Sequence, residues 1–112
     1  MDMSSSRVGD TQIVVVEEDR IDAAVAIAFK DTMRDLTADG EPVVVLDLKS
    51  VNFIDSSGLG AIVAAMKLLG QQRQLHLAAL MPNVEKVFRL TRMDTVFKIH
   101  TSVDDALNTN AG

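Results

Sequence analysis

The sequence has no cysteine, tryptophan or tyrosine, and its four phenylalanines are its only aromatic residues. Without cysteine there is no disulfide framework, no thiol nucleophile and no thiolate metal site, so cysteine redox chemistry is excluded. The core must be built from valine, leucine, isoleucine, alanine and methionine, which are abundant between Ile13 and Leu107. With 47% hydrophobic residues in 112, these side chains suffice for one domain covering residues 1–112.

Long apolar runs and clustered basic residues are also missing. No apolar run approaches the roughly 18 residues of a membrane helix, and residues 1–10 lack the apolar segment of a signal peptide, so we expect a cytoplasmic protein without a membrane contact. The formal net charge is −5. Because nucleic-acid binding relies on clustered lysine and arginine, no nucleic-acid partner is expected. Residues 1–55, with 5 basic and 12 acidic side chains, should carry most of the negative surface.

Strand-like and helix-like patterns alternate along the chain, which predicts an α/β fold. The expected strands are 12–16, 43–48, 75–80 and 96–99, and the expected helices begin near residues 22, 56, 82 and 102. The nearly continuous apolar run 43–48 is typical of a central strand covered on both faces. We therefore expect a mainly parallel or mixed central sheet of about four to five strands with about four helices. Residues 1–10 form either a flexible lead or an irregular edge strand.

Polar residues, glycine and proline beside the apolar runs predict where helices begin and end. The expected boundary residues are Asp22 and 40–42 for the first helix, Gly70 for the end of the second, Pro82 for the start of the third, and Thr101 or Ser102 for the start of the last.

The most unusual segment is 53–60, Phe-Ile-Asp-Ser-Ser-Gly-Leu-Gly, where a buried strand leads into an apolar helix. The first turn of a helix leaves backbone N–H groups unpaired. Ser56 or Ser57 can cap these groups, and Gly58 and Gly60 allow a close approach to the sheet or to an anion. From the residues alone, capping is the more common role of such a segment.

The residues Asp55-Ser56-Ser57-Gly58-Leu59-Gly60 resemble the signature of STAS domains, in particular the anti-anti-sigma factors, also called anti-sigma factor antagonists. The similarity runs from about residue 12 to residue 107 and includes Asp22 ahead of the first helix and Pro82 ahead of the third. The glycine that usually precedes that helix is absent from Asp19-Arg20-Ile21-Asp22, while its aspartate is present.

This resemblance implies a switch operated by phosphorylation. It implies that Ser56 accepts phosphate from a partner anti-sigma factor serine kinase, that the unphosphorylated form binds this partner and frees the sigma factor, and that a serine phosphatase reverses the modification. No cofactor is implied. The implied partner-binding residues are Asp22, Asp55, Ser56, Ser57, Gly58, Leu59 and Gly60. Phosphate would add a charge of about −1.5 to −2, so its effect should fall on the docking partner, provided that the Ser56 hydroxyl faces solvent.

Individual residues of this segment keep more than one interpretation. Ser57 is expected to have a structural role, as a cap or through a hydrogen bond within the loop. Asp55 either orients the Ser56 hydroxyl or makes an Asx turn. Asp22 is an ordinary N-cap on sequence grounds, and only the resemblance makes it a partner contact.

Other functions are less well supported by the residues. A serine nucleophile at Ser56 would need a base, and only His76 and His100 are available, each expected to be a half-buried or exposed strand residue, so no enzyme is expected. No histidine pair has metal-ligand spacing, and the lysine of a phosphate-binding loop is absent. A STAS scaffold subunit of a signalling or transporter complex, without phosphorylation, is the alternative binding function.

Overall fold

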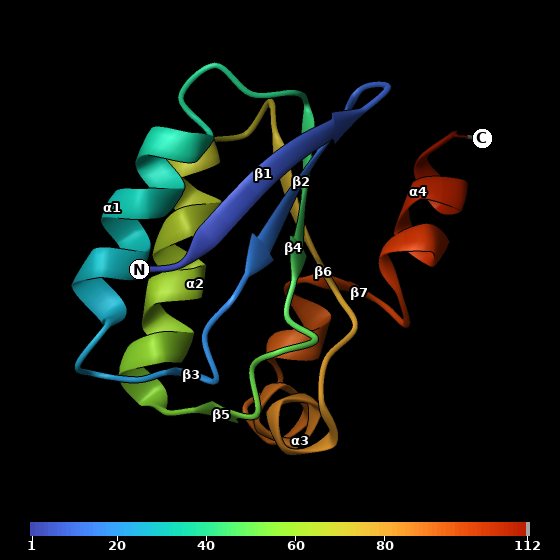
Figure 1. The fold of residues 1–112 in the computed structure, drawn as a ribbon. Helices are drawn as coiled ribbons and strands as arrows, with labels where there is room; N and C mark the ends of the chain where they lie inside the picture. The colour runs from blue at the N-terminus through green and yellow to red at the C-terminus, as the bar shows by residue number, and fades with distance from the viewer. Residues whose placement is uncertain (112) are drawn as a thin grey trace.

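A five-stranded sheet with the strand order β1-β2-β4-β6-β7 forms the centre of the structure, a computed structural model that describes residues 1–111 (Figure 1). β1 runs antiparallel to β2, and the other neighbours are parallel. The strands are β1 (Met3–Val8), β2 (Thr11–Val16), β4 (Val43–Asp47), β6 (Gln74–Ala78) and β7 (Lys98–His100). The predicted α/β class with a mixed sheet is confirmed.

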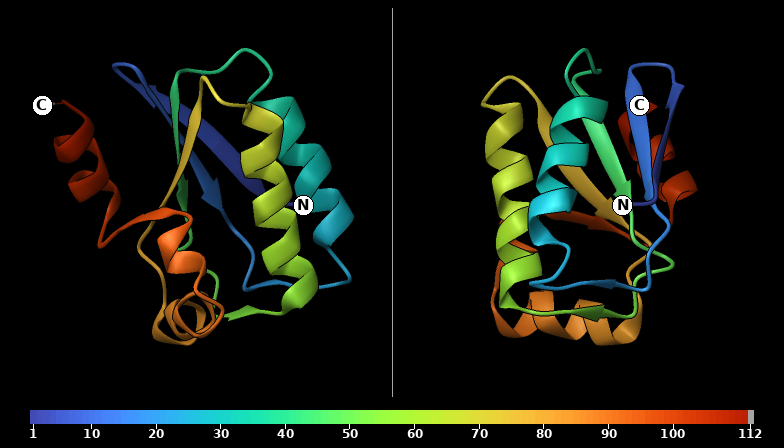
Figure 2. Two further views of the ribbon diagram at one scale, coloured as in Figure 1. Left: turned by 180° about the vertical axis from the view of Figure 1, so that it is seen from behind. Right: turned by 60° about the vertical axis from the view of Figure 1, so that its left-hand side comes forward.

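Helices cover both faces of this sheet. α1 (Ala26–Leu36) and α2 (Ser56–Leu69) lie side by side on one face, and α4 (Val103–Ala111) lies on the other (Figure 2). α3 (Pro82–Leu90) crosses below the end of the sheet where β4 and β6 finish (Figure 1). None of the helices described here is long and apolar enough to cross a membrane.

The alternation of side chains along β4 explains its continuous apolar sequence. Val44 and Leu46 lie in the main core with residues of α1 and α2. Val45 packs in a second cluster with Ala78 of β6 and Ala106 of α4. Because successive strand residues point to opposite faces and both faces are covered, β4 needs apolar residues at consecutive positions.

The predicted boundaries of α1 are wrong at both ends. The N-cap is Val25, and Asp22 instead forms a turn before the helix, in which its Oδ1 accepts a hydrogen bond from Ala24 N at 3.1 Å. The helix ends at Leu36, before residues 40–42. Arg73 Nη1 donates to the Thr37 carbonyl oxygen at 2.7 Å, which satisfies a terminal carbonyl of the helix with a side chain distant in sequence.

The other helix boundaries agree better with the residues predicted from the sequence. α2 ends before Gly70, which has a φ of 78°, the left-handed region that favours glycine. Pro82 is in the first turn of α3. Ser102 Oγ accepts a hydrogen bond from Asp105 N at 3.0 Å at the start of α4, so Ser102 is its cap.

Three short elements were not predicted. β3 (Arg20–Ile21) and β5 (Phe53–Ile54) pair in a small parallel sheet, and η1 (Met93–Thr95) is a turn of 3-10 helix. β7 consequently begins at Lys98, two residues later than the predicted strand 96–99. Such short elements carry too few residues for a periodic pattern.

The first ten residues, for which the sequence left two possibilities, include the regular strand β1. A two-residue turn, Gly9-Asp10, connects β1 to β2. Gly9 has a φ of 59°, and Asp10 is not among the residues with positive φ. Glycine at the first central position with this φ is typical of a type II′ turn, whose twist suits a β-hairpin.

Candidate functional site

The small sheet of β3 and β5 builds the candidate site by joining two loops that are distant in sequence. Arg20 pairs with Phe53 and Ile21 with Ile54. Asn52 N also donates a hydrogen bond to the Asp19 carbonyl oxygen at 2.9 Å. The chain that leads into α1 therefore lies beside the chain that leads into α2, at the lower end of both helices in Figure 1.

Asp55 is the residue that caps α2 and links it to the loop before α1. Its Oδ1 accepts a hydrogen bond from Gly58 N at 2.8 Å, and its Oδ2 accepts one from Ala23 N at 3.1 Å. The Gly58 amide lowers the pKa of the Asp55 carboxyl, burial opposes this, and the amides of Ala23 and Ser57 lower it further. The expectation that Ser56 or Ser57 caps this helix is therefore wrong. Asp55, which was expected either to orient the Ser56 hydroxyl or to make an Asx turn, caps the helix and bridges the two loops.

Ser56 and Ser57 are the first two residues of α2, and both are exposed. Because Asp55 occupies the capping position, neither hydroxyl is needed there. Neither one hydrogen-bonds to any residue that the structure describes. The Ser56 hydroxyl thus meets the condition of solvent access that a phosphorylation switch requires.

The two glycines of the motif have different surroundings. A Cβ atom on Gly58 would overlap the carbonyl oxygen of Ile21, so only glycine allows α2 to lie this close to β3. Gly60 is exposed, and a Cβ atom there would meet nothing within 4 Å. Leu59 is half-buried against the main core. Close packing therefore requires Gly58 but not Gly60.

Asp22 lies beside this cap, since the next residue, Ala23, donates to Asp55. Arg20 Nη1 is 3.6 Å from Asp22 Oδ2, and the Arg20 guanidinium lies 5.6 Å from the centre of the Phe53 ring. Arg20 and Phe53 were not singled out from the sequence. With Ile54 buried, the two-residue alternation of a strand would have placed Phe53 on the outer face.

Exposed apolar side chains accompany the site. Phe53 is 46% exposed on β5, and Ile27, in the first turn of α1, is 71% exposed. Both belong to the segments that β3, β5 and Asp55 hold together. The joined loops and the first turn of α1 therefore carry both carboxylates and exposed apolar side chains, a composition suited to contact with another protein.

His76 and His100 are not placed to act on Ser56. They are 3% and 8% exposed, so the expectation of half-buried or exposed side chains is wrong. His76 Nδ1 and His100 Nε2 are 3.1 Å apart on the neighbouring strands β6 and β7. The flanking residues of His76 lie in the core beneath α1 and α2, so its own side chain is on the opposite face of the sheet, toward α4. Burial is the first cause that lowers the pKa of both imidazoles.

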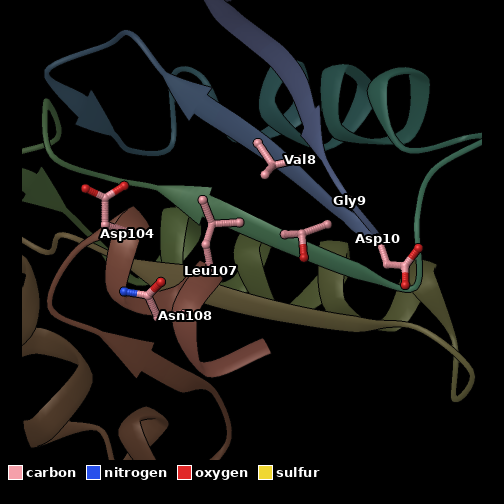
Figure 3. Close-up of a pocket in the computed structure, with 7 residues that line it drawn as sticks. Val8, Gly9, Asp10, Asp104, Leu107 and Asn108 are labelled. Atoms are coloured by element: carbon pink, nitrogen blue, oxygen red, sulfur yellow. The ribbon is translucent and has the colours of Figure 1, made fainter. Parts of the chain in front are cut away.

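No group of three or more metal-ligating side chains occurs among the residues that the structure describes. A hollow of about 630 Å³ lies between the β1–β2 turn and α4 (Figure 3). Asp10 and Asp104 lie on two sides of it, and Val8 and Leu107 provide apolar walls. Its lining includes none of the residues 53–60, so it is separate from the candidate site.

Known proteins resemble this chain over most of its length. The sequence model of the STAS domain matches residues 5–106. An anti-sigma-B factor antagonist of Listeria monocytogenes is 32% identical over 91 residues, which are 80% of this chain and 79% of that protein. The anti-sigma-F factor antagonist RsfB of Mycobacterium tuberculosis is 28% identical over 87 residues, which are 78% and 71% of the two chains.

A solved structure agrees with these sequence similarities. The crystal structure of an anti-sigma factor antagonist from Mycobacterium paratuberculosis has a TM-score of 0.86 and 28% identity to this chain, and the match covers 96% of this chain and 92% of the other.

Proposed function

This chain belongs to the STAS domain family, and we propose that it is an anti-sigma factor antagonist controlled by phosphorylation of Ser56. Its unphosphorylated form binds an anti-sigma factor that is also a serine kinase, and this binding frees the sigma factor. The three relatives described above are named anti-sigma factor antagonists, which supports the class of function. The observation that carries the proposal is the exposed Ser56 hydroxyl at the start of α2, which a kinase or a serine phosphatase can reach.

Electrostatics at the cap explain why a phosphate would act on the partner. The low pKa of Asp55 keeps its carboxylate ionised at neutral pH, and the Gly58 and Ser57 amides already face that carboxylate. A phosphate on Ser56 therefore adds to a negative patch whose nearest amides are already used. An acidic or apolar partner group opposite Ser56 would be repelled or desolvated without compensation.

A modest repulsion is sufficient for a switch. A loss of about 2.8 kcal/mol in binding free energy lowers affinity roughly a hundredfold. A partner bound with micromolar affinity would then dissociate at ordinary cellular concentrations. The exposed side chains of Phe53 and Ile27 supply apolar area for the unmodified complex.

The test uses the purified chain and the anti-sigma kinase encoded beside its gene. After incubation with ATP, mass spectrometry should locate one phosphate on Ser56 and none on Ser57. Calorimetry should show that Ser56→Ala binds the kinase like the unmodified chain, and that Ser56→Asp binds about tenfold or more weakly. Ser57→Ala is the matched control for the modification, because Ser57 is also exposed, and it should keep the phosphate on Ser56.

Three results would reject the proposed switch. Equal affinities of Ser56→Ala and Ser56→Asp would show that charge at this position does not control binding. Phosphate on another residue, or none, would favour the unphosphorylated scaffold function. Binding that is unaffected when Phe53→Ser and Ile27→Ser are combined would place the interface elsewhere.

A further inference from the structure

β1 is an edge strand with little of the usual protection against pairing. It pairs with β2 in an unbroken register from Met3 opposite Val16 to Val8 opposite Thr11. Its sequence, MSSSRV, has no proline, and its only charged residue is Arg7. Natural edge strands are commonly protected by prolines, bulges, charges or very short length. β7, at the other edge, is protected by its length of three residues.

The hydrogen bond of Asp2 identifies which backbone groups of β1 are free. Glu17 N donates to the Asp2 carbonyl oxygen at 2.8 Å, so the opposite residues 2 and 17 are a hydrogen-bonded pair. Hydrogen-bonded and non-hydrogen-bonded pairs alternate along an antiparallel ladder. Residues 4, 6 and 8 therefore bond to β2, while Met3, Ser5 and Arg7 direct their N–H and C=O groups to the outer edge.

These free groups are arranged symmetrically around Ser5. If two copies of β1 run antiparallel with Ser5 opposite Ser5, Met3 of each copy faces Arg7 of the other. This one register pairs every free N–H and C=O of residues 3, 5 and 7, giving about six hydrogen bonds between the chains. We propose that β1 of one copy pairs with β1 of a second copy in this register, so that the two sheets become continuous across a twofold axis.

The side chains of β1 favour a second copy of this chain as the partner that pairs with its free edge. Ser5 lies on the axis and Ser4 faces Ser6 of the other chain, so only small side chains meet at the centre. Like charges directly opposite each other destabilise a strand pair, and this register places Arg7 opposite an uncharged residue. A twofold rotation about Ser5 places the free groups and small residues of one chain opposite the same groups and residues of the other, as a twofold interface requires.

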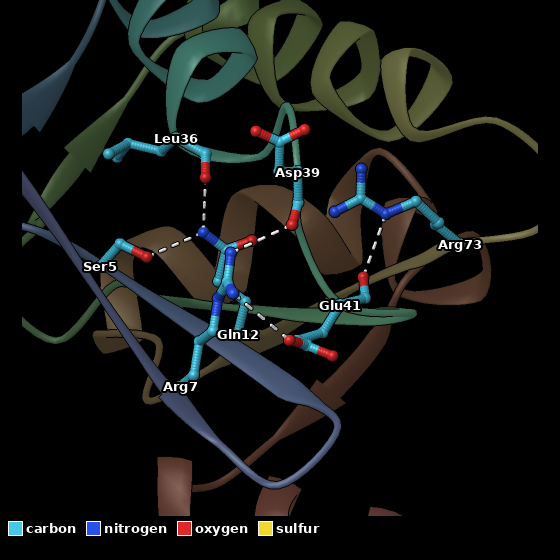
Figure 4. Close-up of polar contacts among 7 residues, drawn as sticks. All are labelled: Ser5, Arg7, Gln12, Leu36, Asp39, Glu41 and Arg73. Atoms are coloured by element: carbon cyan, nitrogen blue, oxygen red, sulfur yellow. Dashed lines mark hydrogen bonds and ion pairs between the residues drawn. The ribbon is translucent and has the colours of Figure 1, made fainter.

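β1 is also held in place before any pairing. Gln12 Nε2 donates to Ser5 Oγ at 2.8 Å, and Arg7 Nη2 donates to the Asp39 carbonyl oxygen at 3.0 Å (Figure 4). Arg7 Nη1 is also 3.6 Å from Glu41 Oε1. These contacts tie the strand to the segment after α1. An edge that is already ordered loses little conformational entropy on pairing.

The interface of one strand per chain is small, so the dimer should be weak. Each chain has a formal net charge of −5, so the two copies repel each other at long range. Added salt screens this repulsion. Dimer formation should therefore increase with salt concentration.

Sedimentation equilibrium between about 10 µM and about 1 mM tests the self-association. Ser5→Pro removes an outward N–H from an edge strand and should weaken the dimer at least about tenfold, with an unchanged circular dichroism spectrum. Ser5→Ala keeps this N–H and should associate like the unmodified chain. Ser6→Pro removes an N–H that bonds to β2, so it should lower the melting temperature of the monomer instead.

Backbone hydrogen exchange on the unmodified chain gives a second test. In dilute solution the amides of residues 4, 6 and 8 should exchange slowly and those of 3, 5 and 7 quickly. At high concentration the amides of 3, 5 and 7 should become protected as well.

A chain that stays monomeric at about 1 mM would overturn the dimer. Protection of residues 3, 5 and 7 only after addition of the anti-sigma kinase would also overturn it, and would assign the edge to an extended segment of that partner. Neither result bears on Ser56, whose modification is measured separately.

Discussion

At the scale of single residues, the candidate site depends on an aspartate and a glycine that support the exposed serine. Asp55 joins the starts of α1 and α2 through Ala23 and Gly58. Gly58 lets α2 pack against the Ile21 carbonyl. The position of Ser56 thus follows from contacts that its own side chain does not make.

Alanine at the two motif glycines should have opposite effects on stability. Gly58→Ala inserts a methyl group where the Ile21 carbonyl lies, and overpacking of this kind costs about 1–3 kcal/mol. Gly60→Ala meets open space in the exposed first turns of the same helix, so it should gain about 0.5–1 kcal/mol from the higher helix propensity of alanine. Urea unfolding measures both changes. A loss of stability in Gly60→Ala equal to that in Gly58→Ala would contradict the packing described here.

Replacement of the Asp55 carboxylate by an amide should change how the thermal stability of the chain depends on pH. Asp55→Asn should melt at a lower temperature than the unmodified chain at pH 7, because an amide offers one acceptor oxygen where the carboxylate uses two. The lowered pKa of Asp55 means that its contribution is present above its unfolded pKa of about 3.9 and disappears as the pH falls through the folded value. Thermal unfolding should therefore show a smaller difference between the two chains at acidic pH. Ser57→Ala, which changes an exposed side chain without such bonds, should melt like the unmodified chain at both pH values.

At the scale of secondary-structure elements, β6 and β7 are joined by a buried polar pair as well as by their backbones. His76 Nε2 lies 2.9 Å from Gln74 Oε1, which only accepts hydrogen bonds, so this nitrogen carries the proton. His76 Nδ1 then accepts a hydrogen bond from His100 Nε2. A proton added to His76 Nδ1 would break this hydrogen bond unless His100 moved its own proton from Nε2 to Nδ1.

The histidine pair should make the fold acid-sensitive. Burial lowers the pKa of both imidazoles, as does the positive charge of Lys98, while Asp105 raises that of His100. The unfolded chain therefore binds more protons than the folded chain below about pH 6.5, and stability should fall there by at most about 1.4 kcal/mol per pH unit for each histidine. Urea unfolding between pH 7.5 and pH 5 measures this slope. His100→Gln should make it shallower, and an unchanged slope would show that the pair is not its source.

Elements differ in how far their sequences predict them. β2, β4 and α2 each contain enough apolar residues for their periodicity to be visible, and all three were predicted within about one residue. β3, β5 and η1 have two or three residues each and exist because of their neighbours. The turn at Gly9-Asp10 was a missed local signal, since glycine followed by aspartate between two strands indicates a hairpin.

At the scale of the whole molecule, charge is distributed unevenly between the two halves of the sequence. Residues 1–55 hold 12 of the 16 acidic side chains, among them Glu17, Asp19, Asp22 and Asp55 of the candidate site and its two loops. A negative surface of this kind accelerates association with a basic partner surface. We therefore expect the anti-sigma kinase to present basic residues to the acidic loops beside Ser56, while the partner group directly opposite Ser56 is acidic or apolar.

Association with the kinase should slow as salt is added. Between about 50 mM and about 300 mM salt, the association rate constant should fall about tenfold, while the dissociation rate constant changes little. Stopped-flow measurements give both constants. Asp19→Asn should reduce this dependence, and Asp104→Asn, on α4 at the hollow of Figure 3, should not. An association rate that rises with salt would show that the partner surface is acidic.

The sequence by itself determined the α/β class, the order of the main elements and the segment 53–60 as the one to examine, because periodicity and composition are local properties of the chain. Only the tertiary structure decided that the Asp55 carboxylate also bridges to Ala23, and that Gly58 rather than Gly60 is sterically required. Each of these outcomes depends on the loop before α1, since Ala23 and Asp55 are 32 residues apart. No pattern within one segment of sequence contains the position of another segment, and that position determines the bridge at Asp55 and the close packing at Gly58.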